Sequence, residues 1–373
     1  MNDTNINWYQ IDDIDELDSP TLVVYPERVK ANIRTAVSMI GDSLRLRPHI
    51  KTSKCLETIE LMMAAGIQKF KCATIAEAEA LGLCQAPDVL LAYQPIGPKL
   101  QRFVTVMKKY PATKYSCLTD NIVAAQQMAA IYTQSGLTVP VYIDVNVGMN
   151  RTGIAPGETL LQLYAACGKL TGIQPSGLHA YDGHIRDIDF TVRSNHADEA
   201  FAVVENLQKN IMAQGFAKPV IIMGGSPAFS GHCKRKEIEC SPGTFVYWDK
   251  GYSDLCPEQH FLTAALVISR VISLPVANRI CIDLGHKSIA AENELARRVY
   301  FLNAPRLLPL SHSEEHLVLE THGEKMYTTG DILYGLPYHV CPTVALFERA
   351  ITIEKGRITG EWKTIARNRR IHV

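Results

Sequence analysis

The chain has 373 residues, of which 47% are apolar, and its 38 Lys and Arg residues balance 38 Asp and Glu residues. A chain of this length and composition can bury a large core, and its balanced charge gives no indication of nucleic acid or of an anionic membrane as a partner. We therefore expect a globular protein that acts on a small molecule.

The amino-terminal segment and the cysteines bear on the compartment. Residues 1–8 contain neither the basic nor the apolar part of a secretion signal, and no apolar run approaches the length of a membrane span. The ten cysteines are scattered along the chain without a CxxC pair. These features predict a cytoplasmic protein whose cysteines are reduced thiols, most of them small core residues.

Short apolar runs alternate with helix-length amphipathic segments between about residues 21 and 248, which is the pattern of βα units and a parallel sheet. The predicted strands are residues 21–25, 44–50, 69–73, 88–93, 114–118, 139–146, 176–181, 220–223 and 244–248. These are one strand too many for an eight-stranded barrel, so one of them is expected to belong elsewhere.

The segments between the predicted strands have helical features. Residues 27–40 and 56–65 carry apolar stripes at helical spacing. Thr74 and Glu77 form a capping-box pattern at the start of a further helix. From about residue 259 the chain becomes rich in strands, at residues 262–270, 279–283, 317–320 and 351–355. Turns rather than long helices separate them, which predicts a smaller, mainly antiparallel domain.

Lys51 directly follows the strand predicted over residues 44–50, in the sequence RPHIKTSK (residues 47–54). If that strand is the first of the barrel, Lys51 lies at the end where barrel enzymes have their active sites, and its amine can trap a carbonyl group. A solvated surface charge is the ordinary alternative for a lysine.

Other polar side chains follow later barrel strands. Arg151 lies past the fifth strand, where it can hydrogen-bond a cofactor or form an ion pair with Asp144. His179 and Tyr181 are two residues apart at the end of the sixth strand, so they point to the same side. We favour Tyr181 over His179 as the catalytic group.

Two small-residue turns are candidates for an anion site. Gly224, Gly225 and Ser226 follow the seventh strand, and Gly243 and Thr244 begin the predicted eighth. Backbone N–H groups in such turns can bind phosphate, and the loops after strands seven and eight of barrels often do so. An ordinary strand-to-loop turn is the alternative for each.

His339 and Cys341 are two residues apart, so an extended backbone would place both side chains on one face, within reach of one metal ion. An imidazole with a thiolate suits zinc, whereas a carboxylate in place of the thiolate would favour manganese or magnesium. Two protein ligands would leave coordination positions for water and substrate.

These motifs resemble those of the D-serine dehydratase and D-threonine aldolase family. Residues 47–54 are similar to its cofactor-lysine segment, residues 150–153 (NRTG) to its Asn-Arg-Thr-Gly segment, and residues 177–184 (GLHAYDGH) to its Tyr-x-Gly-His segment. Residues 337–343 (PYHVCPT) resemble the metal motif of the dehydratase branch, whereas the aldolase branch has His-x-Asp. One departure is Ser53, which stands where the family has a second histidine.

The resemblance implies an α/β protein of pyridoxal phosphate (PLP) fold type III, a (β/α)8 TIM-like barrel with a second, mainly antiparallel β domain. It places the barrel at residues 20–255 and the second domain at residues 1–19 plus 256–373, and it implies that strand 21–25 pairs with the second domain. It also implies PLP on Lys51, Zn²⁺ or alternatively Mn²⁺ or another divalent ion, and a homodimer.

The activity implied by the resemblance is lysis of a D-3-hydroxy amino acid. The leading hypothesis is dehydration and deamination of D-serine or a 3-hydroxy-D-amino acid to a 2-oxo acid and ammonia. A D-threonine-type aldolase giving glycine and an aldehyde is the close alternative. A racemase would need a second base and no metal, and a PLP-binding protein without turnover would be a barrel alone.

Overall fold

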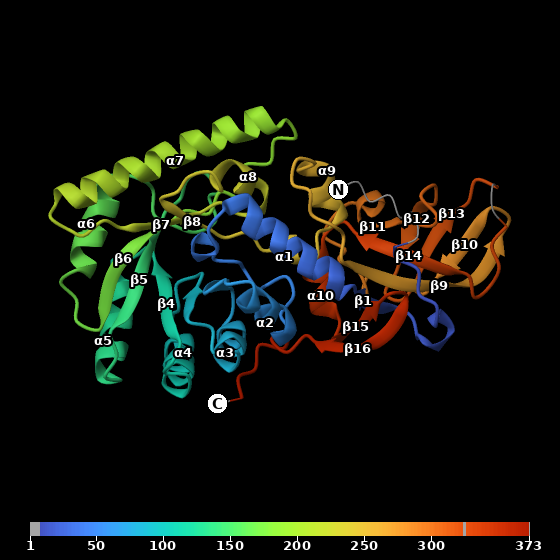
Figure 1. Cartoon of the computed structure of the whole chain (residues 1–373), viewed down its shortest axis with the longest axis horizontal. Helices are drawn as coiled ribbons and strands as arrows, with labels where there is room; N and C mark the ends of the chain where they lie inside the picture. The colour runs from blue at the N-terminus through green and yellow to red at the C-terminus, as the bar shows by residue number, and fades with distance from the viewer. Residues whose placement is uncertain (1–7, 324–325, 373) are drawn as a thin grey trace. The chain divides into compact units, whose positions relative to one another are not determined.

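The computed structural model describes residues 8–323 and 326–372, and the chain divides into two compact units (Figure 1). Unit 1 consists of Met1–Thr35, Thr52–Thr58 and Thr244–Arg367. Unit 2 consists of Ala36–Lys51, Ile59–Gly243 and Asn368–Val373. Helices α1 (Pro26–Ile40) and α2 (Leu56–Ala64) cross the sequence boundaries between the units.

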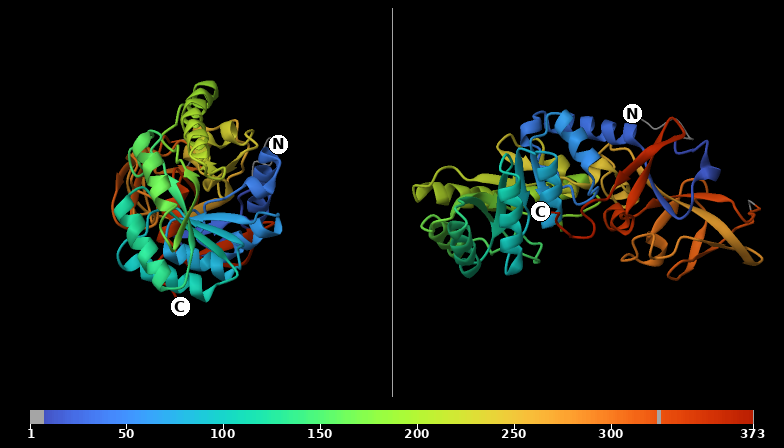
Figure 2. Two further views of the ribbon diagram at one scale, coloured as in Figure 1. Left: turned by 90° about the vertical axis from the view of Figure 1, so that its left-hand side faces the viewer. Right: turned by 90° about the horizontal axis from the view of Figure 1, so that it is seen from below.

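Unit 2 contains a parallel sheet of seven strands in chain order, and the helices lie on its outside (Figure 2, left). The strands are β2 (Lys69–Cys72), β3 (Asp88–Leu91), β4 (Lys114–Thr119), β5 (Val139–Asp144), β6 (Ile173–His179), β7 (Val220–Met223) and β8 (Ile238–Cys240). The helices are α3 (Ile75–Leu83), α4 (Pro98–Lys109), α5 (Ile122–Gln134), α6 (Glu158–Cys167), α7 (Phe190–Ala213) and α8 (Phe229–His232), with 3-10 turns η2 (Ser43–Arg45) and η3 (Ser226–Ala228).

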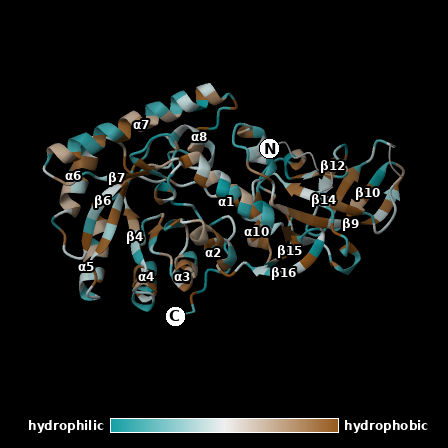
Figure 3. Ribbon diagram, viewed as in Figure 1, coloured by the Kyte–Doolittle hydropathy of each residue, from teal (hydrophilic) through white to brown (hydrophobic). Residues whose placement is uncertain are grey.

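The sequence pattern explains these elements. The strands are rich in apolar residues, which Figure 3 colours brown along the ribbon, and many of these residues are buried. Thr74 caps α3 by accepting a hydrogen bond from the backbone N–H of Glu77 at 3.1 Å, and the Glu77 carboxylate accepts one from Ala73 N at 2.6 Å. The predicted capping box is therefore confirmed.

The first predicted barrel strand, residues 44–50, is present only as two parallel bridges. Leu46 pairs with Cys240 of β8, and His49 pairs with Lys71 of β2. The segment therefore joins the two edge strands of the sheet and completes the barrel. It is not a regular strand because η2 occupies its start and Pro48 cannot donate to a ladder.

The prediction of the eighth strand at residues 244–248 is wrong. The strand is β8, and residues 244–246 form the 3-10 turn η4 (Thr244–Val246). Trp248 N donates to Thr244 O at 2.8 Å, which closes a turn in spite of the high β-propensity of this run. β8 was not predicted because it has only three residues and one of them, Glu239, is charged.

Unit 1 contains a mainly antiparallel sheet of nine strands, in which β1 pairs with β9 and β15. The strands are β1 (Thr21–Val24), β9 (Ala265–Val276), β10 (Arg279–Ile282), β11 (Val299–Phe301), β12 (Leu308–His312), β13 (Leu317–Glu320), β14 (Ile332–Pro337), β15 (Arg349–Glu354) and β16 (Arg357–Lys363). The remaining helical elements are η1 (Ile14–Glu16), α9 (Lys250–Leu255), η5 (Leu295–Arg297) and α10 (Val340–Leu346).

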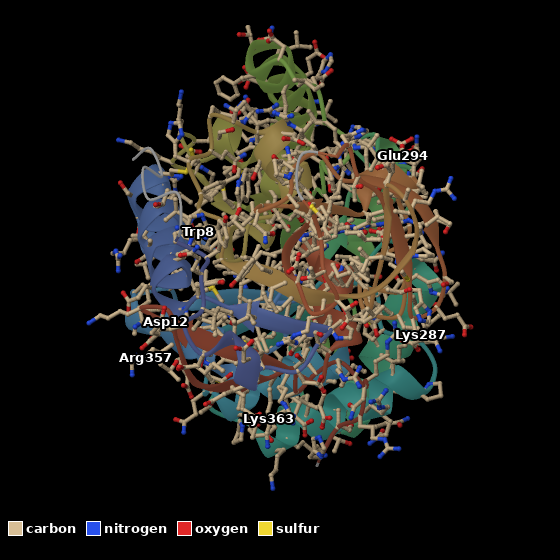
Figure 4. The ribbon with its side chains drawn as sticks, turned by 90° about the vertical axis from the view of Figure 1, so that its right-hand side faces the viewer. Trp8, Asp12, Lys287, Glu294, Arg357 and Lys363 are labelled. Carbon is tan, nitrogen blue, oxygen red and sulfur yellow. The ribbon has the colours of Figure 1, made fainter. Side chains whose placement is uncertain are left out.

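The pairing of β1 shows to which sheet the strand predicted at residues 21–25 belongs. β1 lies between β9 and β15, so the strand predicted at residues 21–25 does pair with the carboxy-terminal strands. Val23, Leu266 and Ile353 belong to one buried cluster there. Figure 4 shows Trp8 and Asp12 on the same side of unit 1 as Arg357, where Asp12 N donates to Gly356 O at 2.7 Å.

Two further features bear on the sequence-based predictions: the state of the cysteines and the length of the apolar helices. All ten cysteines are unbridged, and seven of them are buried, so the prediction of mostly core thiols is confirmed. Among the helices of the described residues, none is both long and apolar enough to cross a bilayer.

Four charged residues form an ion-pair network inside the barrel of unit 2, which we call the lower layer: Arg47, Lys69, Asp88 and Glu239. Arg47 is 1% exposed, and its guanidinium lies 2.7 Å from Glu239 Oε2 and 2.6 Å from Asp88 Oδ1. Lys69 contacts the other Glu239 oxygen. Two cations therefore face two carboxylates, and the layer is electrically balanced.

Candidate active site

Lys51 follows the bridge segment of the barrel and is half-buried. Ile50 N donates to Lys71 O at 3.0 Å, which ties the segment to β2. The backbone N–H of Lys51 donates to His49 Nδ1 at 3.2 Å. These two bonds fix the backbone at the point where the lysine side chain leaves it.

The Tyr181 ring lies at the centre of the sequence-predicted groups of unit 2. The Lys51 amine is 6.0 Å from the ring centroid, and the Arg151 guanidinium is 4.8 Å from it. A third cation, Lys71 of β2, is 5.8 Å from the same centroid. We call one group of residues, near the carboxyl ends of the barrel strands, the upper layer: Lys51, Lys71, Arg151, His179 and Tyr181.

Arg151 belongs to a loop that the neighbouring residues hold in place. The Asn146 side chain accepts hydrogen bonds from Gly148 N and Asn150 N, at 3.1 and 3.0 Å. Gly153 N donates to Asp120 Oδ2 at 3.0 Å. The loop directs Arg151 over Tyr181, and the alternative ion pair with Asp144 is not what the structure shows.

Asp144 instead pairs with His179. The His179 Nδ1–H donates to Asp144 Oδ1 at 2.7 Å, with both side chains almost fully buried. Burial, together with the charge of Lys71, lowers the pKa of His179. Burial raises the pKa of Asp144, but the hydrogen bond and charge of His179, the hydrogen bond of Thr152 and the charge of Lys71 together outweigh it, and the net pKa is lowered. The pair is therefore a neutral imidazole on a carboxylate, with Nε2 available as an acceptor.

The Gly224-Gly225 turn is built around Asp182, which sequence reasoning had overlooked. Gly225 N donates to Asp182 Oδ1 at 3.0 Å and Gly224 N to Asp182 Oδ2 at 3.3 Å. His232 Nε2 lies 2.9 Å from Asp182 Oδ2, and both side chains are fully buried. Burial raises the pKa of Asp182. The hydrogen bond and charge of His232 and the hydrogen bond from the Gly225 amide act in the opposite direction, and the net pKa is lowered. These two amides are therefore directed at Asp182, whereas we expected them to face an anion.

The remaining residues of the predicted phosphate turns lie in two places. Gly243 N donates to Ser226 Oγ at 3.3 Å in unit 2, and a Cβ on Gly243 would lie 2.8 Å from His49 O. Thr244, the next residue, belongs to unit 1, where its hydroxyl is 3.7 Å from Cys341 Sγ. Only a residue without a side chain permits the approach of the Gly243 loop to His49.

His339 and Cys341 lie close together, but the predicted extended backbone is wrong at Cys341. His339 is extended and caps α10, and Cys341 lies in the first turn of that helix. Asp249 accepts a hydrogen bond from Val340 N at 3.0 Å, and the Thr343 hydroxyl donates to His339 O at 2.9 Å. These contacts start the helix directly after the histidine.

The imidazole and the thiol nevertheless interact. Burial disfavours charge on His339, but the hydrogen bond with Cys341, its charge and the nearby carboxylates Asp249 and Glu292 raise the pKa of His339 to about 9. Glu292 contacts His339 Nδ1 directly, and Thr52 Oγ1 is 3.1 Å from Cys341 Sγ. The proton that such a pair shares is one that a metal ion would replace. Among the described residues, no cluster of three or more His, Cys, Asp or Glu side chains is arranged to hold a metal ion.

Ser53 is buried in unit 1, and its hydroxyl is 2.6 Å from Thr58 Oγ1. The side chain that departs from the family pattern is therefore part of the local packing at the start of α2.

Several residues of the two clusters had no role in the sequence prediction: Lys71, Asp182, His232, Thr52 and Glu292. Lys71 left a signal, because a lysine among buried neighbours in a parallel strand is unusual. Asp182 and Glu292 left none, because their partners lie 42 or more residues away in the sequence.

Comparison with known families places the chain. Residues 24–250 match the family described as "Alanine racemase, N-terminal domain", and residues 264–353 match the one described as "Putative serine dehydratase domain". The first match covers more than half of the chain, so the chain belongs to the alanine racemase N-terminal domain family. The predicted PLP fold type III, a barrel with a mainly antiparallel second domain, is confirmed.

Individual proteins similar to this chain include aldolases and a dehydratase. The chain is 25% identical to a D-threonine aldolase from Arthrobacter sp. over 367 residues, which cover 95% of this chain and 94% of the relative. It is 26% identical over 243 residues to a D-threo-3-hydroxyaspartate dehydratase from Delftia sp. (strain HT23), which cover 62% of each chain. The crystal structure of a D-threonine aldolase from Filomicrobium marinum has the same fold, with a TM-score of 0.87 at 23% identity over 95% of this chain and 96% of that one. The family is PLP-dependent, and one solved structure is of a mutant D-threo-3-hydroxyaspartate dehydratase in the metal-free form.

Proposed function

We propose that the chain is a PLP- and metal-dependent lyase that dehydrates and deaminates D-serine or a 3-hydroxy-D-amino acid to a 2-oxo acid and ammonia. The observation that carries the proposal is the convergence of Lys51, Lys71 and Arg151 on the ring of Tyr181. Among the described residues, no carboxylate lies within ion-pair distance of these three cations. Such a site suits a ligand that brings a ring, an aldehyde and negative charge, as PLP does.

Each residue of the upper layer would have its own role in binding or proton transfer. Lys51 would hold the cofactor through its amine and afterwards move the α-proton of the substrate at Nζ. Tyr181 would border the cofactor ring and Arg151 would donate hydrogen bonds to a ring substituent. His179, whose Nδ1–H is held by Asp144 and whose pKa is lowered by burial and by the charge of Lys71, would offer Nε2 as a proton acceptor. Bound PLP supplies an electron sink for the negative charge that develops on the substrate α-carbon.

The phosphate is assigned to the turns after β7 and β8. Asp182 accepts hydrogen bonds from Gly224 N and Gly225 N, so the Ser226 hydroxyl is better placed than those two amides to meet the phosphate, and Gly243 N, which donates to Ser226 Oγ at 3.3 Å, would hold that hydroxyl. Thr244 stays a predicted neighbour of the phosphate.

The metal site is assigned to His339 and Cys341. An imidazole with a thiolate suits Zn²⁺, and a bound Zn²⁺ supplies a Lewis acid that makes the β-hydroxyl a better leaving group. Glu292 would orient the imidazole through Nδ1, as carboxylates do beside zinc-binding histidines. Lys51 and Thr52 are consecutive residues, and Thr52 contacts Cys341, so both assignments involve the same short stretch of sequence.

A D-threonine-type aldolase is the second candidate, because the likeness to the Arthrobacter aldolase extends over nearly the whole of both chains. The thiolate donor Cys341 favours the dehydratase, since the aldolase motif has a carboxylate there. The choice is open to a direct product assay.

The test is to incubate the PLP-loaded protein with D-serine, D-threonine or 3-hydroxy-D-aspartate and to measure 2-oxo acid, glycine and aldehyde, with and without a chelator. The dehydratase predicts 2-oxo acid and ammonia in equal amounts, and loss of turnover when the metal is removed. Glycine with aldehyde as the main products would replace the dehydratase by the aldolase. Turnover unchanged after verified metal removal would exclude the metal role.

Three finer assignments are part of the same proposal. We propose a homodimer in the cytoplasm, and we retain residues 20–255 as the cofactor domain with residues 1–19 plus 256–373 as the metal-bearing domain. Light scattering of the purified protein measures the oligomeric state, with a mass near twice the 41.4 kDa of one chain expected.

A further inference from the structure

Lys71 is a second lysine in the upper layer, and it is more deeply buried than Lys51. It lies on β2, and it is 3% exposed. Its Nζ is 2.6 Å from Ser241 Oγ and 3.4 Å from His179 Nε2. Lysine is almost never buried to this extent unless its charge is paired.

The partners of Lys71 do not neutralise it. Ser241 is a neutral acceptor, and burial together with the nearby charge of Lys71 lowers the pKa of His179, so its imidazole brings no negative charge to Lys71. Among the described residues, no carboxylate lies within ion-pair distance of Lys71 Nζ. An isolated buried ammonium carries a large desolvation penalty, which a protein avoids either by deprotonating the amine or by bringing an anion to it.

Lys69, two residues earlier on the same strand, shows the difference that pairing makes. Lys69 contacts Glu239, which also binds Arg47, so the charge of Lys69 is matched within the lower layer. Both lysines extend from one strand, and side chains two apart lie on the same side of it. Within the described residues, Lys69 therefore has a counter-ion in the barrel, whereas Lys71 has none within ion-pair distance.

We propose that Lys71 provides the counter-charge for an anionic oxygen of the bound ligand, and that it orients Ser241 and His179 toward that ligand. The inference rests on the proposed function, because it places the ligand at the cluster around Lys51. The oxygen belongs to the cofactor or to the carboxylate of the amino-acid substrate. Lys71 is thus a positioning residue that acts together with the upper layer.

The electrostatic surroundings support this assignment. Burial and, next to it, the charge of Lys51 lower the pKa of Lys71 to about 7, although the charges of Asp182 and Asp144 act in the opposite direction. An amine with this pKa is largely neutral in slightly alkaline solution, and a neighbouring anion stabilises its protonated form. The groups that face it from the surrounding elements are Lys51, Arg47, Asp182, Asp144, His179, Tyr181 and Ser241.

The consequence is that Lys71 takes up a proton when the anion enters. Calorimetry at pH 8 in buffers of different ionisation enthalpy measures this proton uptake, first for PLP binding and then for D-alanine binding to the PLP-loaded protein. Uptake in the first step assigns the oxygen to the cofactor, and uptake in the second assigns it to the substrate carboxylate. D-alanine is chosen because it lacks the β-hydroxyl.

The test compares Lys71→Met with the matched variant Lys69→Met. We expect Lys71→Met to remove the proton uptake and to weaken the corresponding binding step by at least about thirtyfold, the loss typical of a buried charge partner. Lys69→Met should keep the uptake of the wild type. Lys71→Arg should restore part of the affinity without any uptake, because arginine stays protonated.

The outcomes separate the inference from the proposed function. Equal affinity and equal proton uptake in wild type and Lys71→Met would overturn the role of Lys71 while leaving the lyase proposal intact. Failure of the wild-type protein to bind PLP would overturn both. Loss of folding in Lys71→Met is recognised by circular dichroism, and the Lys71→Arg arm then decides: proton uptake unchanged from the wild type contradicts the inference.

Discussion

The lower and upper layers of the barrel interior use similar residues in different ways. In the lower layer, Arg47 and Lys69 face Asp88 and Glu239, so each charge has a partner on another segment of the barrel. In the upper layer, Lys51, Lys71 and Arg151 surround one aromatic ring, and the nearest carboxylates serve other groups. Asp144 binds His179 and Asp182 binds the Gly224-Gly225 turn.

The difference indicates which end of the barrel is built for stability and which for a ligand. A balanced network closes the barrel, and removing Arg47 would leave Asp88 without its partner and Glu239 with Lys69 alone. An excess of one charge costs stability in the absence of a ligand, and such excess is expected where binding has been favoured.

Lys51→Ala should abolish the function of the upper layer. We expect at least about a 10³-fold loss of turnover, because the variant loses both the amine that holds the cofactor and the group that moves the α-proton. Unfolding in denaturant should be nearly unchanged. Steady-state kinetics and the absorbance of the lysine-bound cofactor measure the effect, and a variant that keeps both would place the function at another residue.

Arg47→Met should have the opposite profile. It leaves Glu239 and Asp88 without their shared guanidinium, so the free energy of unfolding should fall by about 3 kcal/mol. Turnover per folded molecule should change little. Chemical denaturation with a parallel activity assay tests this, and a large loss of turnover at unchanged stability would erase the distinction between the layers.

Glu292→Gln extends the contrast to unit 1, where a carboxylate orients a histidine assigned to a metal. We expect the affinity for Zn²⁺ to fall by about 10- to 100-fold, the usual effect of removing such a partner. Competition with a chromogenic chelator measures the affinity. Glu294→Gln, a nearby exposed position on unit 1 (Figure 4), is the control and should bind zinc like the wild type. Equal affinities in both variants would remove Glu292 from the metal site.

Gly225→Ala should disturb the upper layer by a small displacement. The added Cβ would lie 3.0 Å from Tyr181 Cε2, so the ring must shift by a few tenths of an ångström. We expect PLP binding to weaken by about tenfold, since small displacements at a site have such costs. Gly231→Ala is the control, because its Cβ would make only ordinary contacts at 3.7 Å and beyond. Equal PLP affinities in Gly225→Ala and Gly231→Ala would show that the ring position does not matter.

The buried carboxylate of Asp182 predicts a modest effect of pH on the stability of the fold. The pKa of Asp182 is lowered in the folded protein, so its contribution to stability is complete above the pKa of an unfolded aspartate, about 3.9, and is lost as the pH falls through the folded value. Denaturation between pH 7 and pH 3 should therefore show a steeper loss for the wild type than for Asp182→Asn. Parallel curves for the two proteins would contradict this assignment.

Much of this arrangement follows from the sequence, and the exceptions have physical causes. Strands β7 and β13 have the predicted bounds, since compact apolar runs between turns define them. The first and eighth barrel strands were misjudged because Pro48 interrupts one and the other is only three residues long. Local patterns also placed Lys51, Arg151 and Tyr181 at strand ends, where the structure brings them together.

The supporting residues were beyond local patterns. Asp182 acquires its role from Gly224, Gly225 and His232, and Lys71 acquires its role from Ser241, 170 residues further along the chain. A periodicity cannot show that a charge lacks a partner, because that depends on every side chain that folding brings near it. The difference between Lys69 and Lys71 becomes visible only in the folded barrel.

The most direct test of the account is to identify the lysine that holds the cofactor. The PLP-loaded protein is reduced with borohydride, digested, and examined by mass spectrometry for the modified lysine. We predict modification at Lys51 with Lys69 and Lys71 unmodified, and no fixed cofactor in Lys51→Ala. Cofactor fixed to another lysine in the wild type, or no fixed cofactor at all, would contradict the assignment of the upper layer as the active site.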